Sequence, residues 1–404
     1  MSNPKVYFKN LDSIRFIAAS MVVVAHAISP SYQYLPIKNT VWERLLNTIS
    51  NGGTGVSIFF VLSGFLITYL LINEHELNGK ISVKKFYLRR ILRIWPLYFL
   101  VIIFTFLIYP FAKSLMGVNN PLASNLWYHV FFLSNFDVIN IARYSMGNDA
   151  MSQNITWSVS IEEQFYLFWP LLFILLPKRF WIYSMVLVVI VSILFRIINS
   201  HDDLVLYFHT ISVLLDLGIG GLIACLIKQN KNVRTIFENS STLAHVLLFS
   251  LSFCLLFWSD IFFSSEYGHA IGRIFISISF GLIIGAQAMT KNDSILNLSN
   301  FSFASKRGRY TYGMYLLHPI AITFVDVARR LLDVKNTNFT SLFCLGLISF
   351  AVTMILSKAS FKYFEARFLL YKESFATTKR LKSEEVRPNG IDMEFNFDPS
   401  KMIR

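Results

Sequence analysis

Long apolar runs alternate with short polar segments along almost the whole chain. An α-helix needs about 20 mostly apolar residues to cross a bilayer, so runs of roughly that length are candidate transmembrane helices. Ten runs come close to that length, over residues 11–29, 54–72, 91–110, 160–177, 180–199, 204–227, 242–258, 270–289, 310–328 and 339–357. The pattern predicts an all-α, polytopic membrane helix bundle with about ten transmembrane helices.

Two stretches depart from this pattern. Between the third and fourth runs, residues 122–136 are apolar but too short to cross, and Pro110 and Pro121 precede them. They predict a short re-entrant or interfacial segment. The last part of the chain is polar and mixed in charge, which predicts a transmembrane domain over residues 1–371 and a disordered cytoplasmic tail over residues 372–404.

Basic residues set the expected orientation. Residues 73–93 contain six of them and lie in the cytoplasm by the positive-inside rule. The six are Lys80, Lys84, Lys85, Arg89, Arg90 and Arg93. Both termini are then cytoplasmic, although the pair Arg329 and Arg330 falls on the outer side. The net charge of +13 over 404 residues gathers at such flanks of a chain that is 54% apolar, so we expect a lipid bilayer and no nucleic acid as its partner.

The first apolar run carries Arg15 and His26, which are eleven positions apart. At about 100° and 1.5 Å per residue, they project from one helix face and lie about 16 Å apart along the axis. Ionisable groups inside a bilayer are costly and mark a polar cavity or a substrate path, whereas a hydrogen-bonded interfacial histidine is the structural alternative. A second alternative is a signal peptide, because Lys5 and Lys9 precede the run and residues 25–27 resemble a cleavage site.

A run of arginines follows the second apolar run. Arg89 and Arg93 are four positions apart and Arg90 and Arg93 are three apart, so a helix would gather them into one cationic patch. Guanidinium groups suit phosphate. The alternative is an ordinary positive flank, with Trp95 and Tyr98 as part of an aromatic belt.

Two adjacent glutamates begin the fourth run. Ser160 and Glu163 fit the spacing of a capping box, in which each side chain bonds to the backbone N–H at the other position. Glu162 is then available to face the bundle as a hydrogen-bond acceptor for a substrate hydroxyl or for a histidine.

Other conspicuous residues have structural interpretations. Glycines in residues 52–65 indicate close helix packing rather than a phosphate loop. Cysteines 225, 254 and 344 lie in apolar runs without metal-ligand spacing, so we expect free, buried thiols, and no motif requires a metal. His318, which precedes Pro319, lines a cavity or is a structural histidine at a proline kink.

Together these runs resemble the acyltransferase 3 family of integral membrane acyltransferases, over most of residues 8–370. The resemblance is carried by five elements in their usual order: Arg15 with His26, residues 55–68, the arginine run 86–98, Trp157-Ser158 with Glu162-Glu163, and Tyr312-Gly313 with Tyr315 and His318-Pro319. The family often has an acidic residue where Ser57 stands.

The resemblance implies a bacterial inner-membrane enzyme with acetyl-CoA, or another acyl-CoA, as its cytoplasmic donor. It implies a hydroxyl of a cell-surface glycan, or of its lipid-linked precursor, as the acceptor. It also implies that Arg15 and His26 form an essential pair in the first helix, and that Arg89 and Arg93 form an essential cytoplasmic pair.

Our hypothesis is that Arg89, Arg90 and Arg93 hold the CoA phosphates while His26 acts as general base toward the acceptor hydroxyl. Arg15 holds a donor phosphate or stabilises developing negative charge, and Glu162 orients His26 or the sugar. The rival hypothesis is a membrane transporter or flippase-like envelope protein that uses the same polar residues as a relay. The acceptor, the acyl group, a covalent intermediate and the oligomeric state are left open by the sequence.

Overall fold

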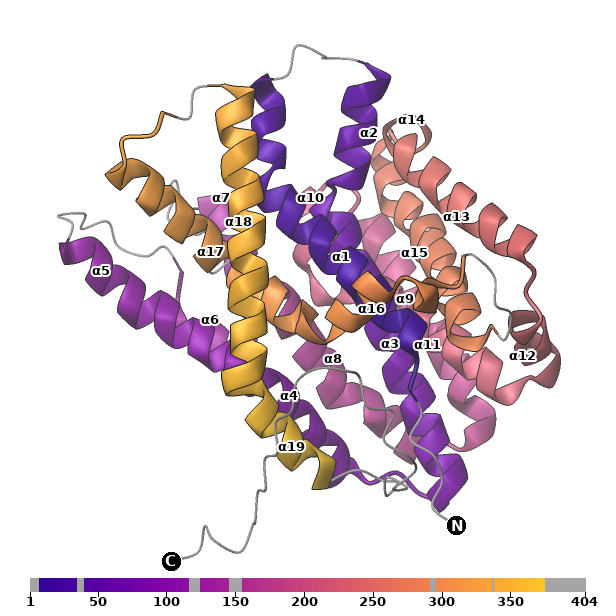
Figure 1. Cartoon of the computed structure of the whole chain (residues 1–404). Coiled ribbons are helices and arrows are strands. Elements are labelled where there is room, and N and C mark those ends of the chain that lie inside the picture. Colours follow the sequence, from indigo (N-terminus) through magenta and orange to yellow (C-terminus); the bar gives the residue numbers. More distant parts are fainter. Residues whose placement is uncertain are drawn as a thin grey trace, which may run out of the picture.

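The computed structural model describes residues 7–34, 40–115, 124–144, 155–290, 296–335 and 338–374. Within these ranges every regular element is a helix, which confirms the all-α prediction (Figure 1). Most of the predicted tail, from residue 375, lies outside the described residues.

Ten long helices form the bundle, and each coincides with one of the ten predicted runs. They are α1 (Lys9–Ala27), α3 (Gly52–Asn78), α4 (Val83–Ile103), α8 (Thr156–Leu175), α9 (Trp181–Ile198), α11 (Thr210–Gln229), α13 (Thr242–Phe257), α15 (Glu266–Met289), α17 (Thr311–Leu331) and α18 (Phe339–Ser360).

Short helices connect or extend them. The α-helical ones are α2 (Val41–Ile49), α5 (Tyr109–Leu115), α6 (Leu126–Val130), α7 (Ser134–Tyr144), α10 (Asp203–Phe208), α12 (Lys231–Glu238), α14 (Ser259–Phe262), α16 (Ser302–Arg307) and α19 (Ala366–Ser374). The 3-10 turns are η1 (Ser29–Tyr34), η3 (Lys178–Phe180), η4 (Leu298–Asn300) and η5 (Gly308–Tyr310), and the π-helical turns are η2 (Phe104–Ile108) and η6 (Phe361–Glu365).

Six helical stretches of the described chain are long and apolar enough to cross a membrane. They are Val41–Asn78, Val83–Leu115, Lys178–Ile198, Thr210–Gln229, Glu266–Met289 and Phe339–Tyr371. A seventh candidate is the pair α12 and α13, which is bent by 92°. The chain is therefore a multi-pass membrane protein by the length and composition of its helices, while the count of ten spans and the cytoplasmic termini stay predictions.

Three of the predicted spans, in α1, α8 and α17, are not among these candidates. Each carries polar side chains that face other helices, such as Arg15 in α1 and Glu162 in α8. In α17 the polar group is His318, which is fully buried. Polar groups inside a membrane protein face the bundle interior or a cavity, so these three helices line the polar interior of the bundle.

Polar side chains and one glycine define several helix ends. Asn51 caps α3 by accepting a hydrogen bond from the backbone of Thr54 at 2.9 Å. Ser265 begins α15 in the same way, and Asn338 forms a capping box with Ser341 at the start of α18. Gly79 ends α3 with φ +68°, a conformation that favours glycine.

Glycines allow the closest helix contacts, at the centre of the bundle. A Cβ built on Gly64 of α3 would lie 2.0 Å from the backbone oxygen of Leu217, and one on Gly220 of α11 would lie 2.0 Å from that of Val61. A Cβ on Gly55 would lie 2.6 Å from the oxygen of Ala18 in α1. The prediction that residues 52–65 serve close packing is confirmed.

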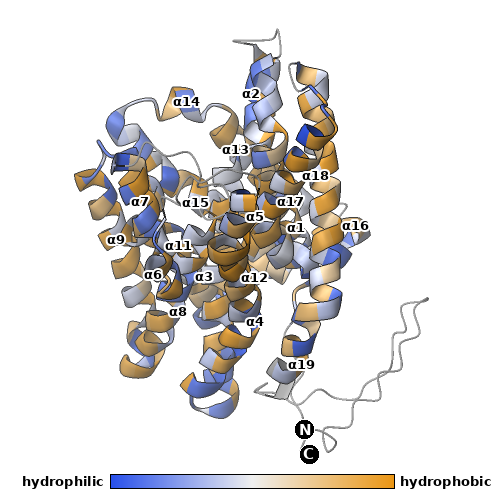
Figure 2. Cartoon of the chain, turned by 90° about the vertical axis from the view of Figure 1, so that its left-hand side faces the viewer, coloured by the Kyte–Doolittle hydropathy of each residue, from blue (hydrophilic) through white to orange (hydrophobic). Residues whose placement is uncertain are grey.

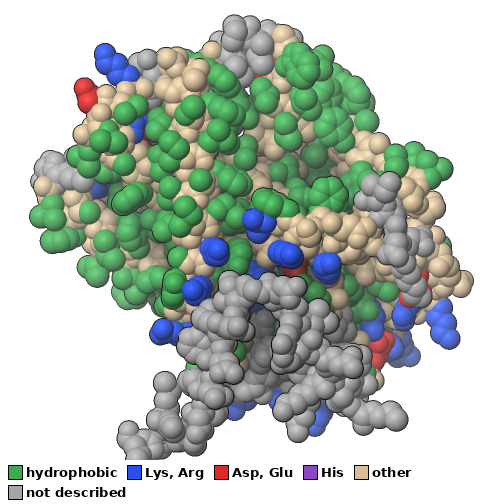
Figure 3. All heavy atoms as spheres, viewed as in Figure 1, with side chains coloured by type: hydrophobic (Ala, Val, Ile, Leu, Met, Phe, Trp, Pro, Cys, Tyr) green, Lys and Arg blue, Asp and Glu red, His purple; other side chains and the backbone are tan. Residues whose placement is uncertain are grey.

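The outer surface fits a lipid environment. Hydrophobic residues cover the outward faces of the long helices, whereas hydrophilic residues gather toward their ends (Figure 2). On one face, Lys and Arg side chains collect below a broad hydrophobic area, over α16 and the lower part of α18 (Figures 1 and 3). The exposed basic residues of α16, η5, α18 and η6 are Lys306, Arg309, Lys358 and Lys362.

Two further predictions meet different outcomes. The segment predicted to be re-entrant or interfacial forms the short helices α6 and α7 where it is described, and neither is long enough to cross a membrane. All three cysteines are free, but only Cys225 is buried, and Cys344 is exposed. The expectation of three buried thiols was wrong because an apolar helix in a membrane can turn part of its surface toward lipid.

Candidate active site

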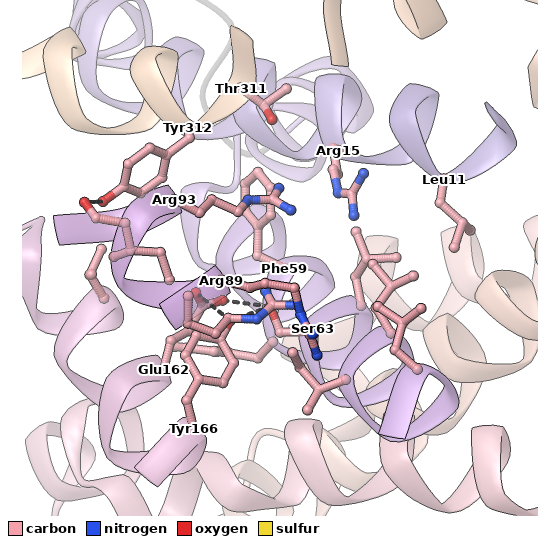
Figure 4. Close-up of a pocket in the computed structure, with 18 of the residues that line it drawn as sticks. Leu11, Arg15, Phe59, Ser63, Arg89, Arg93, Glu162, Tyr166, Thr311 and Tyr312 are labelled. Atoms are coloured by element: carbon pink, nitrogen blue, oxygen red, sulfur yellow. Dashed lines mark hydrogen bonds between the residues drawn. The ribbon is translucent and has the colours of Figure 1, made fainter. Parts of the chain in front are cut away.

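A cavity of about 410 Å³ lies between α1, α3, α4, α8 and α17 (Figure 4). Apolar side chains form much of its wall, but many polar groups converge on it. The polar lining consists of Tyr7, Arg15, Ser63, Asn73, Glu74, Arg89, Arg90, Arg93, Ser158, Glu162, Tyr166, Thr311, Tyr312 and Tyr315. The cavity combines hydrophobic walls with a high density of positive charge.

All four predicted arginines line this cavity. Figure 4 shows Arg15 and Arg93 turned toward one another, although they come from α1 and α4. Arg15 pairs with Asp12, one helical turn away, at 2.5 Å, and Arg89 pairs with Glu74 of α3 at 3.0 Å. The sequence predicted the patch on α4, and the structure adds Arg15 to it.

Arg90 and Arg93 differ from the other two arginines. Arg90 stacks on the ring of Tyr166, with 5.2 Å between the guanidinium carbon and the ring centroid. In the part of the chain that the structure describes, neither Arg90 nor Arg93 has an ion pair or a hydrogen-bond partner for its side chain. The Glu162 carboxylate lies near enough to interact electrostatically with both, but it forms an ion pair with neither. One carboxylate does not balance the positive charge of the cavity, so this part of it can bind an anion.

Glu162 lies in the same cavity and is fixed by two hydroxyl groups. Ser63 donates to it at 2.7 Å and Tyr166 at 3.0 Å. The structure thus places the Glu162 carboxylate among the arginines and not beside His26. The hypothesis that Glu162 orients His26 therefore has no support from the contacts of this carboxylate.

The predicted capping box at Ser160 and Glu163 was wrong. The helix α8 begins at Thr156, so Ser160 lies inside it and shares a hydrogen bond with Ser134 of α7 at 2.7 Å. Glu163 accepts a hydrogen bond from the indole of Trp95 at 3.0 Å. Contacts with neighbouring helices extend α8 beyond the cap that local spacing suggested.

Tyr315 of α17 lines the cavity. The hydroxyl of Tyr315 forms a hydrogen bond with Ser158 of α8 at 2.6 Å and donates to the backbone oxygen of Ile155 at 3.2 Å. Its ring packs edge-on against Phe59. This contact joins α8 to α17 at residues that line the cavity.

His26 does not line the cavity. Its Nδ1 is 2.8 Å from the backbone oxygen of Val22, and its ring is exposed near the end of α1. The ring of His318 lies between, with its centroid 5.0 Å from that of His26 and 6.1 Å from that of Tyr315. Arg15 and His26 thus share a helix, but only Arg15 faces the cavity.

The sequence analysis missed several partners of these residues. Asp12 stands three positions before Arg15, a spacing that signals a helical ion pair, whereas Glu74 had no local signal. Asp216 of α11 is fully buried, pairs with Arg273 of α15 at 2.5 Å and accepts from Ser57 at 3.2 Å. A carboxylate thus lies beside the position where the family often has an acidic residue, but it comes from another helix.

Together these features define a polytopic membrane protein with a cationic internal cavity and an exposed histidine on one of the helices that line it. Comparison with known proteins makes this class more specific. The family model of the acyltransferase domain (acyltransferase 3) matches residues 8–358, and the chain belongs to this family.

Curated relatives carry matching names. The chain is 26% identical over 380 residues to the peptidoglycan O-acetyltransferase OatA of Listeria monocytogenes, covering 89% of this chain and 55% of OatA. It is 27% identical over 384 residues to the putative peptidoglycan O-acetyltransferase YrhL of Bacillus subtilis, covering 89% of this chain and 54% of YrhL. The chain thus spans about half the length of the curated relatives it matches. No solved structure matches it.

Proposed function

We propose that the chain is an inner-membrane O-acetyltransferase. It takes an acetyl group from acetyl-CoA, bound from the cytoplasmic side, and transfers it to a hydroxyl of a cell-envelope glycan or of its lipid-linked precursor. Family membership and the names of the relatives support acyl transfer to oxygen. The remaining steps are argued from the contacts of the cavity.

One observation favours acetyl-CoA as the donor. Arg90 and Arg93 face the cavity without an ion-pair partner among the described residues. CoA carries several phosphate groups, and guanidinium forks bind phosphate through paired, charge-assisted hydrogen bonds. The phosphates of acetyl-CoA would give these two arginines the ion-pair partners that they lack.

The shape of the cavity sets the direction of the donor. Arg89 and Glu74 line the cavity together with Ser158 and Tyr315. We take Arg89 and Glu74 as its first, cationic end and Ser158 and Tyr315 as its second end, because Tyr315 is in ring contact with His318, and His318 with His26. The phosphates bind at the first end, and the pantetheine arm extends toward the second along the apolar wall formed by residues such as Phe59. The thioester then lies against the ring of Tyr315, on the side toward His318.

His26 supplies the base. A carbonyl oxygen only accepts hydrogen bonds, so the bond to Val22 fixes the proton of neutral His26 on Nδ1 and leaves the lone pair on Nε2. Nε2 takes the proton of the acceptor hydroxyl while that oxygen forms a bond to the thioester carbonyl carbon. The carbon–sulfur bond breaks, and the proton passes to the thiolate of CoA.

In this proposal the transfer requires Tyr315 to move. Tyr315 stands between the cavity and the two histidines, held by Ser158 and Ile155. Release of these hydrogen bonds lets the ring turn aside and brings the thioester to His26. Arg15, on the same helix as His26, adds a cation to the path of the donor.

The proposal is tested by turnover of the purified protein in lipid nanodiscs. Acetyl-CoA and soluble peptidoglycan fragments are supplied, and CoA release is measured together with acetylation of the fragments by mass spectrometry. Acceptor-dependent CoA release is expected from the unmodified protein, with a loss of about 10²-fold or more in His26→Ala. If His26→Ala turns over at the rate of the unmodified protein, His26 is not the general base.

A matched control variant tests whether the loss of turnover in His26→Ala is specific to that residue. Arg309→Ala removes an exposed arginine outside the cavity and is expected to leave turnover unchanged. A protein that moves the fragments across a membrane without acetylating them would support the transporter hypothesis and contradict our proposal.

A further inference from the structure

We propose that His318 is a positioning residue for His26. Its Nε2 accepts a hydrogen bond from the Nε2–H of His26 after His26 has taken the proton of the acceptor. The inference rests on the proposed role of His26 and extends it to a second histidine on another helix.

The local sequence fixes the tautomer of His318. Pro319 has no backbone N–H, so the carbonyl of Tyr315, four positions earlier, lacks its helical partner. The Nδ1 of His318 lies 2.7 Å from that oxygen and 3.3 Å from the oxygen of Met314. Since both oxygens only accept, Nδ1 carries the proton of neutral His318, and Nε2 has the lone pair.

That lone pair has no partner. His318 is fully buried, and its Nε2 has no hydrogen bond to any described residue. A buried acceptor without a donor costs stability, so such an atom in a folded protein calls for a functional explanation. The fold keeps this acceptor directly beside His26, with 5.0 Å between the ring centroids and 40° between the ring planes.

The neutral pair cannot form a hydrogen bond, and the protonated pair can. In both histidines Nδ1 donates to a backbone carbonyl, so both Nε2 atoms are acceptors. When His26 takes up a proton, its Nε2 becomes a donor and His318 is the acceptor beside it. The proposed bond therefore forms only in the state that base catalysis creates, which is where stabilisation accelerates a reaction.

The surroundings offer no substitute for His318. Tyr315 is the other titratable group in ring contact with it, and the Tyr315 hydroxyl is engaged with Ser158 and Ile155. No carboxylate of the described residues forms an ion pair with His26 or His318. The imidazolium of His26 thus lacks the acidic partner that a catalytic triad provides.

Two substitutions in the full chain test the inference. His318→Leu removes the acceptor, and His318→Gln keeps an amide oxygen that can accept the bond. With acetyl-CoA and peptidoglycan fragments, we expect kcat to fall about 10²-fold in the leucine variant, and less in the glutamine variant, with the KM for acetyl-CoA unchanged. His245→Leu replaces another buried histidine, far along the chain on α13, and should leave kcat unchanged.

The outcomes separate the two proposals. A kcat of His318→Leu equal to that of the unmodified protein would overturn the inference. Equal losses in the leucine and glutamine variants, with a weaker affinity for CoA and a lower unfolding temperature in both, would overturn it in favour of a purely structural histidine. Unmodified turnover in His26→Ala would instead overturn the proposed function itself.

Discussion

At the scale of single residues, the four arginines of the cavity divide into two kinds. Arg15 and Arg89 have carboxylate partners, whereas Arg90 and Arg93 face the cavity without an ion pair among the described residues. A cation that balances a buried acid supports the fold, and a cation without such a partner is available for a ligand. Substitution should separate these roles.

Arg89→Ala should destabilise the protein and Arg93→Ala should not. Glu74 is only 4% exposed, and the loss of Arg89 leaves its carboxylate with the backbone N–H of Ser82 as the remaining donor described for it. We expect Arg89→Ala to cost about 1–3 kcal/mol of folding free energy. Thermal unfolding in detergent measures this, and equal unfolding temperatures for the two variants would contradict the division.

Tyr315→Phe should admit water to the cavity and so raise the rate of acetyl-CoA hydrolysis. The substitution keeps the ring and removes the hydroxyl that bonds to Ser158 and Ile155. If this contact shields the thioester, water reaches it more readily in the variant, and acetyl-CoA hydrolysis without an acceptor should rise several-fold. Tyr371→Phe, on the exposed side of α19, is the control. Unchanged hydrolysis in Tyr315→Phe would show that the hydroxyl does not close the cavity.

At the scale of helices, one buried ion pair joins α11 to α15. Asp216 is fully buried and accepts from Arg273 and Ser277 of α15 and from Ser57 of α3. Three helices thus share one carboxylate. Removing one partner leaves an uncompensated charge inside the bundle, which is costly in a medium with little water.

Asp216→Ala should therefore destabilise the protein strongly, by about 3–5 kcal/mol, whereas the double variant Asp216→Ala with Arg273→Ala should regain part of the loss. The exposed pair of Asp326 and Arg330 is the control, and Asp326→Ala should cost at most about 1 kcal/mol. Unfolding in detergent gives these values. A double variant no more stable than Asp216→Ala would argue against direct coupling of the pair.

The helices themselves were predictable from the sequence, because each apolar run is long enough to dominate its local structure. The contacts between them were not. The arginine run predicted a cationic patch on α4 by residue type and spacing. The approach of Arg15 from α1, and the contact of Tyr315 with Ser158, depend on how the helices pack. Glu162 was expected to orient either His26 or the sugar, and packing places its carboxylate beside Ser63 and Tyr166, where it has no contact with His26. Local patterns do not determine which face of one helix meets which face of another.

At the scale of the whole molecule, the predicted orientation in the membrane rests on the distribution of charge. The loop between α3 and α4 and the helix α19 lie at one end of the bundle, and the connection between α17 and α18 lies at the other (Figure 1). Arg329 and Arg330 were an exception to the positive-inside rule, and both pair with Asp326 at 2.9 Å. This local pairing reduces their effect on orientation.

Cysteine labelling tests the orientation. In a variant whose three cysteines are replaced by serine, Lys80→Cys probes the loop between α3 and α4, and Lys335→Cys probes the opposite end. A membrane-impermeant maleimide should label Lys335→Cys in intact cells and Lys80→Cys only after permeabilisation. The reverse pattern would place the cationic end of the cavity outside the cell, where acetyl-CoA is absent.

The central claim is that the cavity binds acetyl-CoA through Arg90 and Arg93, and calorimetric titration of CoA into the purified protein tests it most directly. We predict saturable binding that weakens as salt is raised, and a loss of about 10-fold or more in affinity for Arg93→Ala, since a charge-assisted hydrogen bond contributes about 1.5–3 kcal/mol. The combined variant Arg90→Ala with Arg93→Ala should lose binding altogether, while Arg309→Ala should bind as the unmodified protein does. Equal CoA affinity in all four proteins, or no binding to the unmodified one, would contradict the account.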